Sequence, residues 1–198
     1  MNATSPKIAR ETLMSLEAYA KARPEFRTKA IAHKRLRTVH LGQHVTLLFE
    51  DETTIRYQIQ EILRAEKQFE EAGIKDEIDA YGPLIPDGRN FKATMLIEYT
   101  DEAERKVALT QLKGIEDKTY IQVEGSKKVY AIADEDLERE TATKTSAVHF
   151  LRFELSEEMA AALKYGVSLA MGVDHPNYAV KVDALGNETR SALVKDLK

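Results

Sequence analysis

The second half of the chain carries the same order of predicted elements twice, and this repetition restricts the fold more than any other feature. The first copy has a strand, a capped helix, two strands and a short acidic helix: residues 93–99, 100–113, 119–124, 129–133 and the segment from Asp134. The second copy has a strand, a capped helix, two strands and a closing helix: residues 148–155, 156–165, 167–173, 178–182 and the segment from Asn187. Either the chain contains a duplication, which predicts a pseudo-twofold axis, or a common local order occurs twice by accident.

The short connections in this half decide the kind of sheet. Only Asp174 to Asn177 separates the last two predicted strands. A link of that length permits an antiparallel hairpin, because a parallel crossover needs a dozen or more residues. Both repeated helices begin with a hydroxyl residue followed by acidic residues, as helix N-termini prefer. We therefore expect an α+β fold with an antiparallel or mixed sheet and helices on one face.

The N-terminal part is predicted to be helical apart from one hairpin. Helices over 12–22 and 25–34 are expected on either side of Pro24, and the spacing of apolar residues predicts a longer helix over 53–71. Strands at 36–41 and 45–50 are joined by a tight loop at Gly42 and Gln43. Turn-forming residues at 81–90 mark a boundary. We expect a helix, hairpin and helix region over 1–90 and the duplicated region over 91–198, or one compact domain overall.

Composition excludes several classes of protein. The 198 residues include no cysteine, which rules out disulfides, thiolate-bound zinc and an iron–sulfur cluster ligated by this chain alone. The chain shows neither a signal-peptide core nor an apolar run long enough to span a membrane, so we expect a cytoplasmic protein without membrane association. Because it also lacks a glycine-rich phosphate loop, a nucleophile elbow and a His-Glu-x-x-His motif, no catalytic residue is predicted.

Asp174 and His175 are the strongest candidates for a ligand or metal site. They end an apolar strand in a tight connection, and loops of this kind often carry function. Asp174 could orient the imidazole of His175, an arrangement that serves general bases and supports metal ligands. Alternatively, both residues only form the turn, with a solvated histidine.

Three further residues are candidates because of the faces on which they are predicted to lie. His149 shares the core side of its strand with apolar neighbours, as a hydrogen-bonded core histidine or as a metal ligand or proton carrier. Glu66 lies on the apolar face of its helix, where a carboxylate needs a partner unless it reaches water at the helix end. Glu154 offers a second carboxylate. A groove lined by these side chains could hold a divalent metal or a small ligand.

His40 and His44 are four residues apart, which would place both on one face of a helix as metal ligands. Gly42 and the flanking alternation predict a hairpin instead. With Gly42 and Gln43 in the loop, Leu41 faces His44 and His40 faces Val45, so the two imidazoles point to opposite faces.

Charge is unevenly distributed along the chain. Between Lys21 and Arg37 there are seven basic residues and one acidic residue, a balance of +6 within a chain of net charge −4. The candidates for binding a partner are Arg27, Lys34, Arg35 and Arg37. Aromatic residues for base stacking are nearly absent there, so a protein partner is favoured over nucleic acid. The alternative is a solvated helix face.

The chain resembles an uncharacterised bacterial domain-of-unknown-function family (3501) over nearly its whole length. The segments that carry the resemblance are Ser15–Glu17, Leu47–Glu50, Gln58–Glu66, Pro83–Gly88, Ile132–Leu137, Ser146–Leu155 and Gly172–Pro176. Members of that family are often encoded beside rubrerythrin-like and iron–sulfur oxidoreductase proteins, which implies an accessory role in redox or peroxide handling. The resemblance carries no catalytic residues.

Two hypotheses therefore stand side by side, with a third behind them. In the first, the chain is an accessory protein that docks to a redox partner through the basic segment and the repeated β-rich half, with no chemistry of its own. In the second, a groove with His175, Asp174, His149 and a carboxylate such as Glu66 or Glu154 holds a metal or small ligand for redox or hydrolytic chemistry. The third, nucleic-acid binding through Arg35 and Arg37, is disfavoured by the net negative charge.

Overall fold

The computed structural model describes residues 8–198, and these fold into two units that interleave along the chain. One unit contains the residues up to Leu36 together with Glu50–Pro86, and the other contains Arg37–Phe49 together with Asp87–Lys198. The chain passes from the first unit to the second for the last time between Pro86 and Asp87, close to the division expected at residue 90. The hairpin 37–49 differs from the expected division, because it belongs with the C-terminal unit. The expectation about a signal sequence concerns mostly residues 1–7, which lie outside the described residues.

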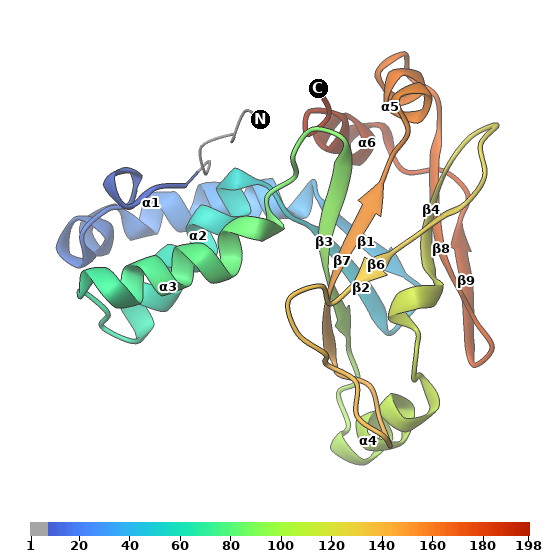
Figure 1. The fold of residues 1–198 in the computed structure, drawn as a ribbon, viewed down its shortest axis with the longest axis horizontal. Helices are drawn as coiled ribbons and strands as arrows, with labels where there is room; N and C mark the ends of the chain where they lie inside the picture. The colour runs from blue at the N-terminus through green and yellow to red at the C-terminus, as the bar shows by residue number, and fades with distance from the viewer. Residues whose placement is uncertain (1–7) are drawn as a thin grey trace. The chain divides into compact units, whose positions relative to one another are not determined.

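The first unit is helical (Figure 1). Its elements are η1 (Arg10–Thr12), α1 (Leu16–Arg35), α2 (Glu52–Ala65), α3 (Glu71–Tyr81) and η2 (Gly82–Leu84). Ser15 caps α1 by accepting from the Ala18 N–H, and Asp51 caps α2 by accepting from the Thr54 N–H. A small apolar core lies between the helices, formed by Ile8, Leu13, Ile55, Ile59, Leu63, Ile74 and Ile85.

Two predicted helix boundaries in this unit are wrong. A single helix, α1, runs through Pro24. Aromatic contacts extend across this point, because Phe26 packs edge-to-face on Tyr19 at 5.8 Å and stacks on Tyr57 at 6.2 Å. The long helix predicted over 53–71 ends at Ala65 and is followed by Lys67 in the left-handed region, with φ of 53°. The chain then turns into α3, which the apolar spacing did not reveal.

A half-buried ion-pair network joins α1 to α2. The Tyr19 hydroxyl donates to Glu61 Oε1 at 2.6 Å, and the Arg23 guanidinium donates to both carboxylate oxygens at 2.8 and 2.7 Å. Arg23, more than the opposing effect of burial, holds the pKa of Glu61 at about 2, well below its ordinary 4.5.

The second unit consists of two antiparallel sheets, three α-helices and one short 3-10 helix, and the predicted α+β class is confirmed. One sheet has the order β1-β2-β3-β7-β6 and the other the order β5-β4-β8-β9. The strands are β1 (Thr38–Leu41), β2 (Val45–Phe49), β3 (Asn90–Ile97), β4 (Thr119–Val123), β5 (Val129–Tyr130), β6 (Ile132–Ala133), β7 (Val148–Glu154), β8 (Leu169–His175) and β9 (Tyr178–Val182). The helices are α4 (Glu102–Gln111), η3 (Glu116–Lys118), α5 (Glu157–Lys164) and α6 (Asn187–Val194).

One apolar core lies between the inner faces of the two sheets. Phe49, Phe91, Phe153 and Met95 reach it from the first sheet, and Met171 from the second. The helices lie at the ends of the facing sheets, with α4 at one end and α5 and α6 at the other, rather than covering one face as expected (Figure 1). Equivalent strands of the two predicted copies are neighbours, because β3 pairs antiparallel with β7 and β4 with β8. This arrangement is compatible with a pseudo-twofold relation, and the duplication itself stays a prediction.

The β1–β2 hairpin is shifted by one residue from the predicted register. Leu41 pairs with Val45 and His40 with Thr46, which leaves a loop of Gly42, Gln43 and His44. Gly42 has a φ of 74°, a left-handed conformation that suits glycine in such a loop. The His40 ring contacts the Thr46 hydroxyl at 3.0 Å, whereas His44 stacks on Tyr99. The two imidazoles therefore contact different residues and do not come together as a pair of metal ligands.

No helix among residues 8–198 combines the length and the apolar character needed to cross a membrane.

The Glu61 network predicts an acid-sensitive contribution to folding. Glu61 is ionised in the folded state down to about pH 2, but in the unfolded state only above about 4.5. Its stabilisation is therefore complete above pH 4.5 and is lost as the pH falls toward 2. We expect Glu61→Gln to lower the free energy of unfolding at pH 7 by about 1–2 kcal/mol, since the carboxylate is partly solvated.

The measurement is urea denaturation at a series of pH values. The difference between wild type and Glu61→Gln should shrink as the pH decreases below 4.5. Glu17→Gln is the matched control, because Glu17 pairs with Lys21 on the exposed surface of α1, and its effect should be small at every pH. A difference that is independent of pH would contradict this account.

Candidate metal centre

His149 is buried on the inner face of β7 because the alternation of the strand turns it toward the core. It lies opposite Met95 of β3 and has no exposed surface. Its Nδ1 atom lies 2.6 Å from Asp134 Oδ2. Its Nε2 atom lies 2.8 Å from the Thr145 hydroxyl and 3.1 Å from the Ser146 carbonyl oxygen. Both ring nitrogens thus have short polar contacts inside the protein.

Asp134 is held in place by the end of the β6–β7 ladder. Its N–H donates to the Phe150 carbonyl at 2.8 Å, and its Oδ1 accepts from the Phe150 N–H at 3.0 Å. The residue has a φ of 50°, which Asp tolerates better than most residues. The predicted acidic helix from Asp134 is therefore wrong: the residue closes a strand, and the chain continues as turns and bends.

Glu116 supplies a second carboxylate from the short η3 helix, and it is only 7% exposed. Its Oε2 atom lies 3.8 Å from His149 Nε2 and 3.4 Å from the Thr145 hydroxyl. Burial, with the negative charges of Glu140 and Asp117 adding to it, raises the pKa of Glu116 above its ordinary value. One ligand atom from each of Glu116, Asp134 and His149 can lie within 4.8 Å of the others, as a shared metal ion requires.

An acidic cavity of 320 Å³ adjoins this cluster. Its charged lining residues are Glu116, Asp117, Asp134, Glu138, Glu140 and Arg139. Arg139 is committed to Asp134 and Asp136, at 3.2 and 2.6 Å, and lies over the Phe150 ring. Five carboxylates beside one guanidinium make this the kind of cavity that attracts cations.

Around His149 Nε2 and Glu116 Oε2, hydrogen-bond acceptors outnumber the hydrogen atoms available for donation. With Asp134 ionised, the hydrogen between it and His149 is on Nδ1, so a neutral ring presents a lone pair at Nε2. The single hydroxyl hydrogen of Thr145 then faces both Nε2 and Glu116 Oε2, and the Ser146 carbonyl oxygen adds a further acceptor. Either a proton on Glu116, whose pKa is raised by burial, or a cation balances this excess. A carboxylate on one ring nitrogen and a metal on the other is a recurrent arrangement of metal-ligating histidines.

The predicted Asp174–His175 pairing is absent. The two side chains leave β8 on opposite faces, as neighbours in a strand do. The Asp174 carboxylate accepts from Lys128 and from Tyr130, each at 2.6 Å, and these bonds lower its pKa. His175 is buried, with Nε2 3.0 Å from the Lys113 carbonyl and Nδ1 accepting from the Asn177 N–H. His175 therefore stabilises the turn.

The other two carboxylate candidates also lie outside the cluster. Glu154 is on the outer face of β7, where it accepts from Arg152 at 2.6 Å and Asn90 at 3.2 Å. Glu66 is the exposed C-cap of α2 in the helical unit. The predicted groove of His175, Asp174, His149 and Glu66 or Glu154 is thus not formed, and His149 alone belongs to the cluster.

Sequence reasoning missed Glu116 and Thr145. Glu116 follows Gly114 in a segment that resembles an ordinary solvated turn, and no periodic pattern marks it as buried. The acidic helix predicted from Asp134 gave no reason to expect this carboxylate beside His149. The local sequence does not reveal that β6 pairs with β7 beside His149.

The predicted partner-binding residues lie in different environments. Arg37 is 1% exposed, with Nε donating to the Phe49 carbonyl at 2.9 Å and a further bond to the Asp196 carboxylate, so it is not available to a partner. Lys34 lies over the Tyr57 ring at 5.2 Å. Arg27 and Arg35 are exposed.

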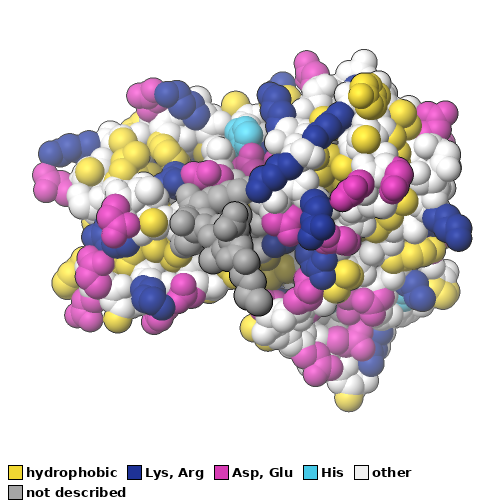
Figure 2. Space-filling model, turned by 45° about the horizontal axis from the view of Figure 1, so that its top comes forward, with side chains coloured by type: hydrophobic (Ala, Val, Ile, Leu, Met, Phe, Trp, Pro, Cys, Tyr) yellow, Lys and Arg dark blue, Asp and Glu magenta, His cyan; other side chains and the backbone are white. Residues whose placement is uncertain are grey.

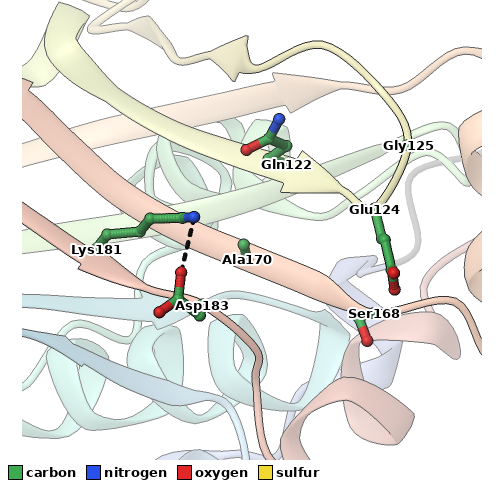
Figure 3. A pocket seen from close by; sticks show the side chains of 7 residues that line it. All are labelled: Gln122, Glu124, Gly125, Ser168, Ala170, Lys181 and Asp183. Atoms are coloured by element: carbon green, nitrogen blue, oxygen red, sulfur yellow. Dashed lines mark ion pairs between the residues drawn. The ribbon is translucent and has the colours of Figure 1, made fainter.

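A second hollow, of 410 Å³, lies on the outer face of the four-stranded sheet (Figure 3). Lys181 points across it toward Asp183, and the two side chains form an ion pair at 2.7 Å. The charges of Lys181 and Asp183 therefore neutralise each other. It supplies no constellation comparable to that around His149.

The fold and cluster define an α+β protein with two facing antiparallel sheets and a buried histidine between carboxylates. The family model described as "protein of unknown function (DUF3501)" matches residues 7–197, and the chain belongs to this family. The resemblance expected from the sequence is thereby confirmed. A crystal structure titled as a novel protein of unknown function from Burkholderia pseudomallei K96243 is 54% identical, with a TM-score of 0.93. The match covers 96% of this chain and 99% of that one. No curated protein matches the chain.

The geometry around His149 predicts the effect of an amide at position 134. Asn tolerates the left-handed conformation and still accepts from the Phe150 N–H through Oδ1, but it presents N–H donors to Nδ1. We expect Asp134→Asn to move the ring hydrogen of His149 from Nδ1 to Nε2, toward the Ser146 carbonyl. Stability should fall by about 1 kcal/mol, because a neutral hydrogen bond replaces a charge-assisted one.

The tautomer is read from the ¹⁵N chemical shifts of the imidazole in metal-free protein, and the stability from urea denaturation. Asp136→Asn is the control, since Asp136 contacts Arg139 but not His149, and it should leave the ring signals unchanged. A wild-type ring protonated on both nitrogens at pH 7, or an unchanged tautomer in Asp134→Asn, would contradict the assignment.

Proposed function

We propose that this protein binds a divalent transition-metal ion through His149 and Glu116. The observation that carries the proposal is the buried excess of acceptors at His149 Nε2, Glu116 Oε2 and the Ser146 carbonyl. Asp134 does not bind the metal ion in this proposal; its contact with Nδ1 orients the imidazole so that Nε2 faces the ion.

The distances are close to those that a metal ion requires. Metal–nitrogen and metal–oxygen bonds of about 2.1 Å around a tetrahedral ion place neighbouring ligand atoms roughly 3.4 Å apart. Nε2 lies 3.8 Å from Glu116 Oε2 and 3.1 Å from the Ser146 oxygen, so a small rotation of the glutamate suffices. One imidazole with oxygen donors suits Zn²⁺, Mn²⁺ or Fe²⁺ better than Ca²⁺ or Mg²⁺, which prefer oxygen alone. The acidic cavity supplies an approach for the cation.

Metal binding is tested on chelator-stripped protein by calorimetry and by thermal unfolding with Zn²⁺, Mn²⁺ and Fe²⁺ in turn. We expect one ion per chain, and at a free metal concentration of about 100 times the Kd a stabilisation of about 2.7 kcal/mol. Glu116→Gln keeps the shape of the side chain and removes its charge, so affinity should fall by about ten- to a hundredfold.

Asp117→Asn is the matched control, because Asp117 lines the same cavity but is outside the cluster, and its affinity should stay near that of wild type. Equal affinities of wild type and Glu116→Gln would place any bound ion elsewhere. If no metal binds, a proton rather than a cation compensates the excess of acceptors, and the proposal fails.

A second candidate is docking to an acidic protein partner, of which the redox protein expected from the family context is one kind. The supporting observation is that Arg27 and Arg35 of α1 are exposed, and neither side chain has a hydrogen bond or ion pair to any residue in 8–198. The face shown in Figure 2 intersperses basic with acidic side chains, without the single-sign field that nucleic acid would need.

Docking is tested by reversing both charges, Arg27→Glu with Arg35→Glu, and identifying co-purified proteins from the native host by mass spectrometry. A partner that is captured by wild type and lost in the double variant supports docking. Lys21→Glu is the control, because Lys21 already pairs with Glu17 on the same helix. Retention of every captured partner by the double variant would exclude this surface.

A further inference from the structure

A third cavity, of 650 Å³, lies at the end of the five-stranded sheet. Four segments of the second unit line it: the β1–β2 loop, the end of β3 with the turn that follows, α4, and the start of β7. Its walls are mainly apolar, with Leu96, Tyr99 and Val148 among the lining residues. Arg105 of α4 supplies its one basic side chain other than histidine.

The walls of this cavity are held rigidly by contacts that do not involve Arg105. The His44 ring stacks on Tyr99, with centroids 3.9 Å apart and planes within 7°. His44 Nδ1 lies 2.9 Å from the Glu98 carbonyl, and the Glu98 N–H donates to the His44 carbonyl at 2.7 Å. The Tyr178 hydroxyl accepts from the His44 N–H and donates to the Leu41 carbonyl at 2.6 Å. A ligand would therefore enter a preformed site.

Arg105 differs from the other arginines. In the part of the chain that the structure describes, the guanidinium of every other buried or half-buried arginine donates at least one hydrogen bond. These arginines are Arg10, Arg23, Arg37, Arg56, Arg139, Arg152 and Arg190. Within those same residues the half-buried Arg105 guanidinium has no hydrogen bond and no ion pair, although it lines the cavity. A partly desolvated guanidinium that makes no ion pair favours an anionic ligand.

We propose that this cavity binds a small organic carboxylate, with its carboxylate on Arg105 and its apolar part against Leu96, Tyr99 and Val148. A single guanidinium matches one carboxylate in a bidentate contact. Inorganic phosphate fits less well, because it has no apolar part to place against these walls. The inference does not depend on metal binding at His149.

The test is a ¹H–¹⁵N NMR titration of the chelator-stripped full chain with benzoate and with hexanoate. We expect saturable shifts centred on Tyr99, Arg105 and Val148 at millimolar ligand or below. Hexanol is the neutral analogue and should bind much more weakly. Arg105→Gln removes the charge from a partly exposed side chain, and it should weaken binding about tenfold or more.

Lys106→Gln is the matched control, since Lys106 is the next residue of α4, is 72% exposed, pairs with Glu102 and lies outside the cavity. Its titration should match that of wild type. Absence of saturable shifts, equal binding by Arg105→Gln, or equal binding of hexanol would overturn the proposal. Tighter binding of inorganic phosphate than of either carboxylate would overturn the ligand class. Because the protein is stripped of metal, these outcomes are independent of the metal proposal.

Discussion

The antiparallel pairing of β3 with β7 is the constraint on which the rest of the second unit depends. It brings together the first strands of the two predicted copies and places His149 opposite Met95 and Val148 opposite Leu96. Successive residues of a strand face opposite sides of the sheet. His149 therefore points into the core, while Val148 lines the 650 Å³ cavity that contains Arg105. A shift of one residue in this pairing would exchange the two faces and abolish both sites.

Burial of charged groups around His149 carries a cost that the fold compensates locally. An isolated buried carboxylate is strongly unfavourable, yet Asp134 and Glu116 both lie beside the imidazole. Asp134 recovers part of its lost hydration by accepting the Phe150 N–H and the Arg139 guanidinium. The contacts of the Glu116 carboxylate to the other side chains of the cluster are long, 3.4 Å to Thr145 and 3.8 Å to His149. This asymmetry makes Glu116 the residue that gains most from a bound cation.

Local patterns predicted the elements that are stabilised by local interactions. The helix at Ser156 begins where its cap predicts, and the core-facing side of β7 follows from simple alternation. Predictions were wrong where distant residues decide. Pro24 does not end α1, and beyond it Phe26 stacks on Tyr57 of α2. Arg37 belongs to a basic run in the sequence, but its guanidinium is buried against Phe49, Ala192 and Asp196.

The sequence by itself determined the α+β class, the antiparallel hairpins, most of the strands and the inward orientation of His149, because these depend on residue spacing within about a dozen positions. The tertiary structure alone decided which side chains meet. Asp134 and Glu116 come from 15 and 33 positions before His149, and Arg105 reaches a wall built by loops about 60 and 40 residues away. These distances are closed by strand pairing and by burial in a shared core, which depend on the whole chain at once. For the same reason Asp174 and His175, adjacent in sequence, point to opposite faces of β8.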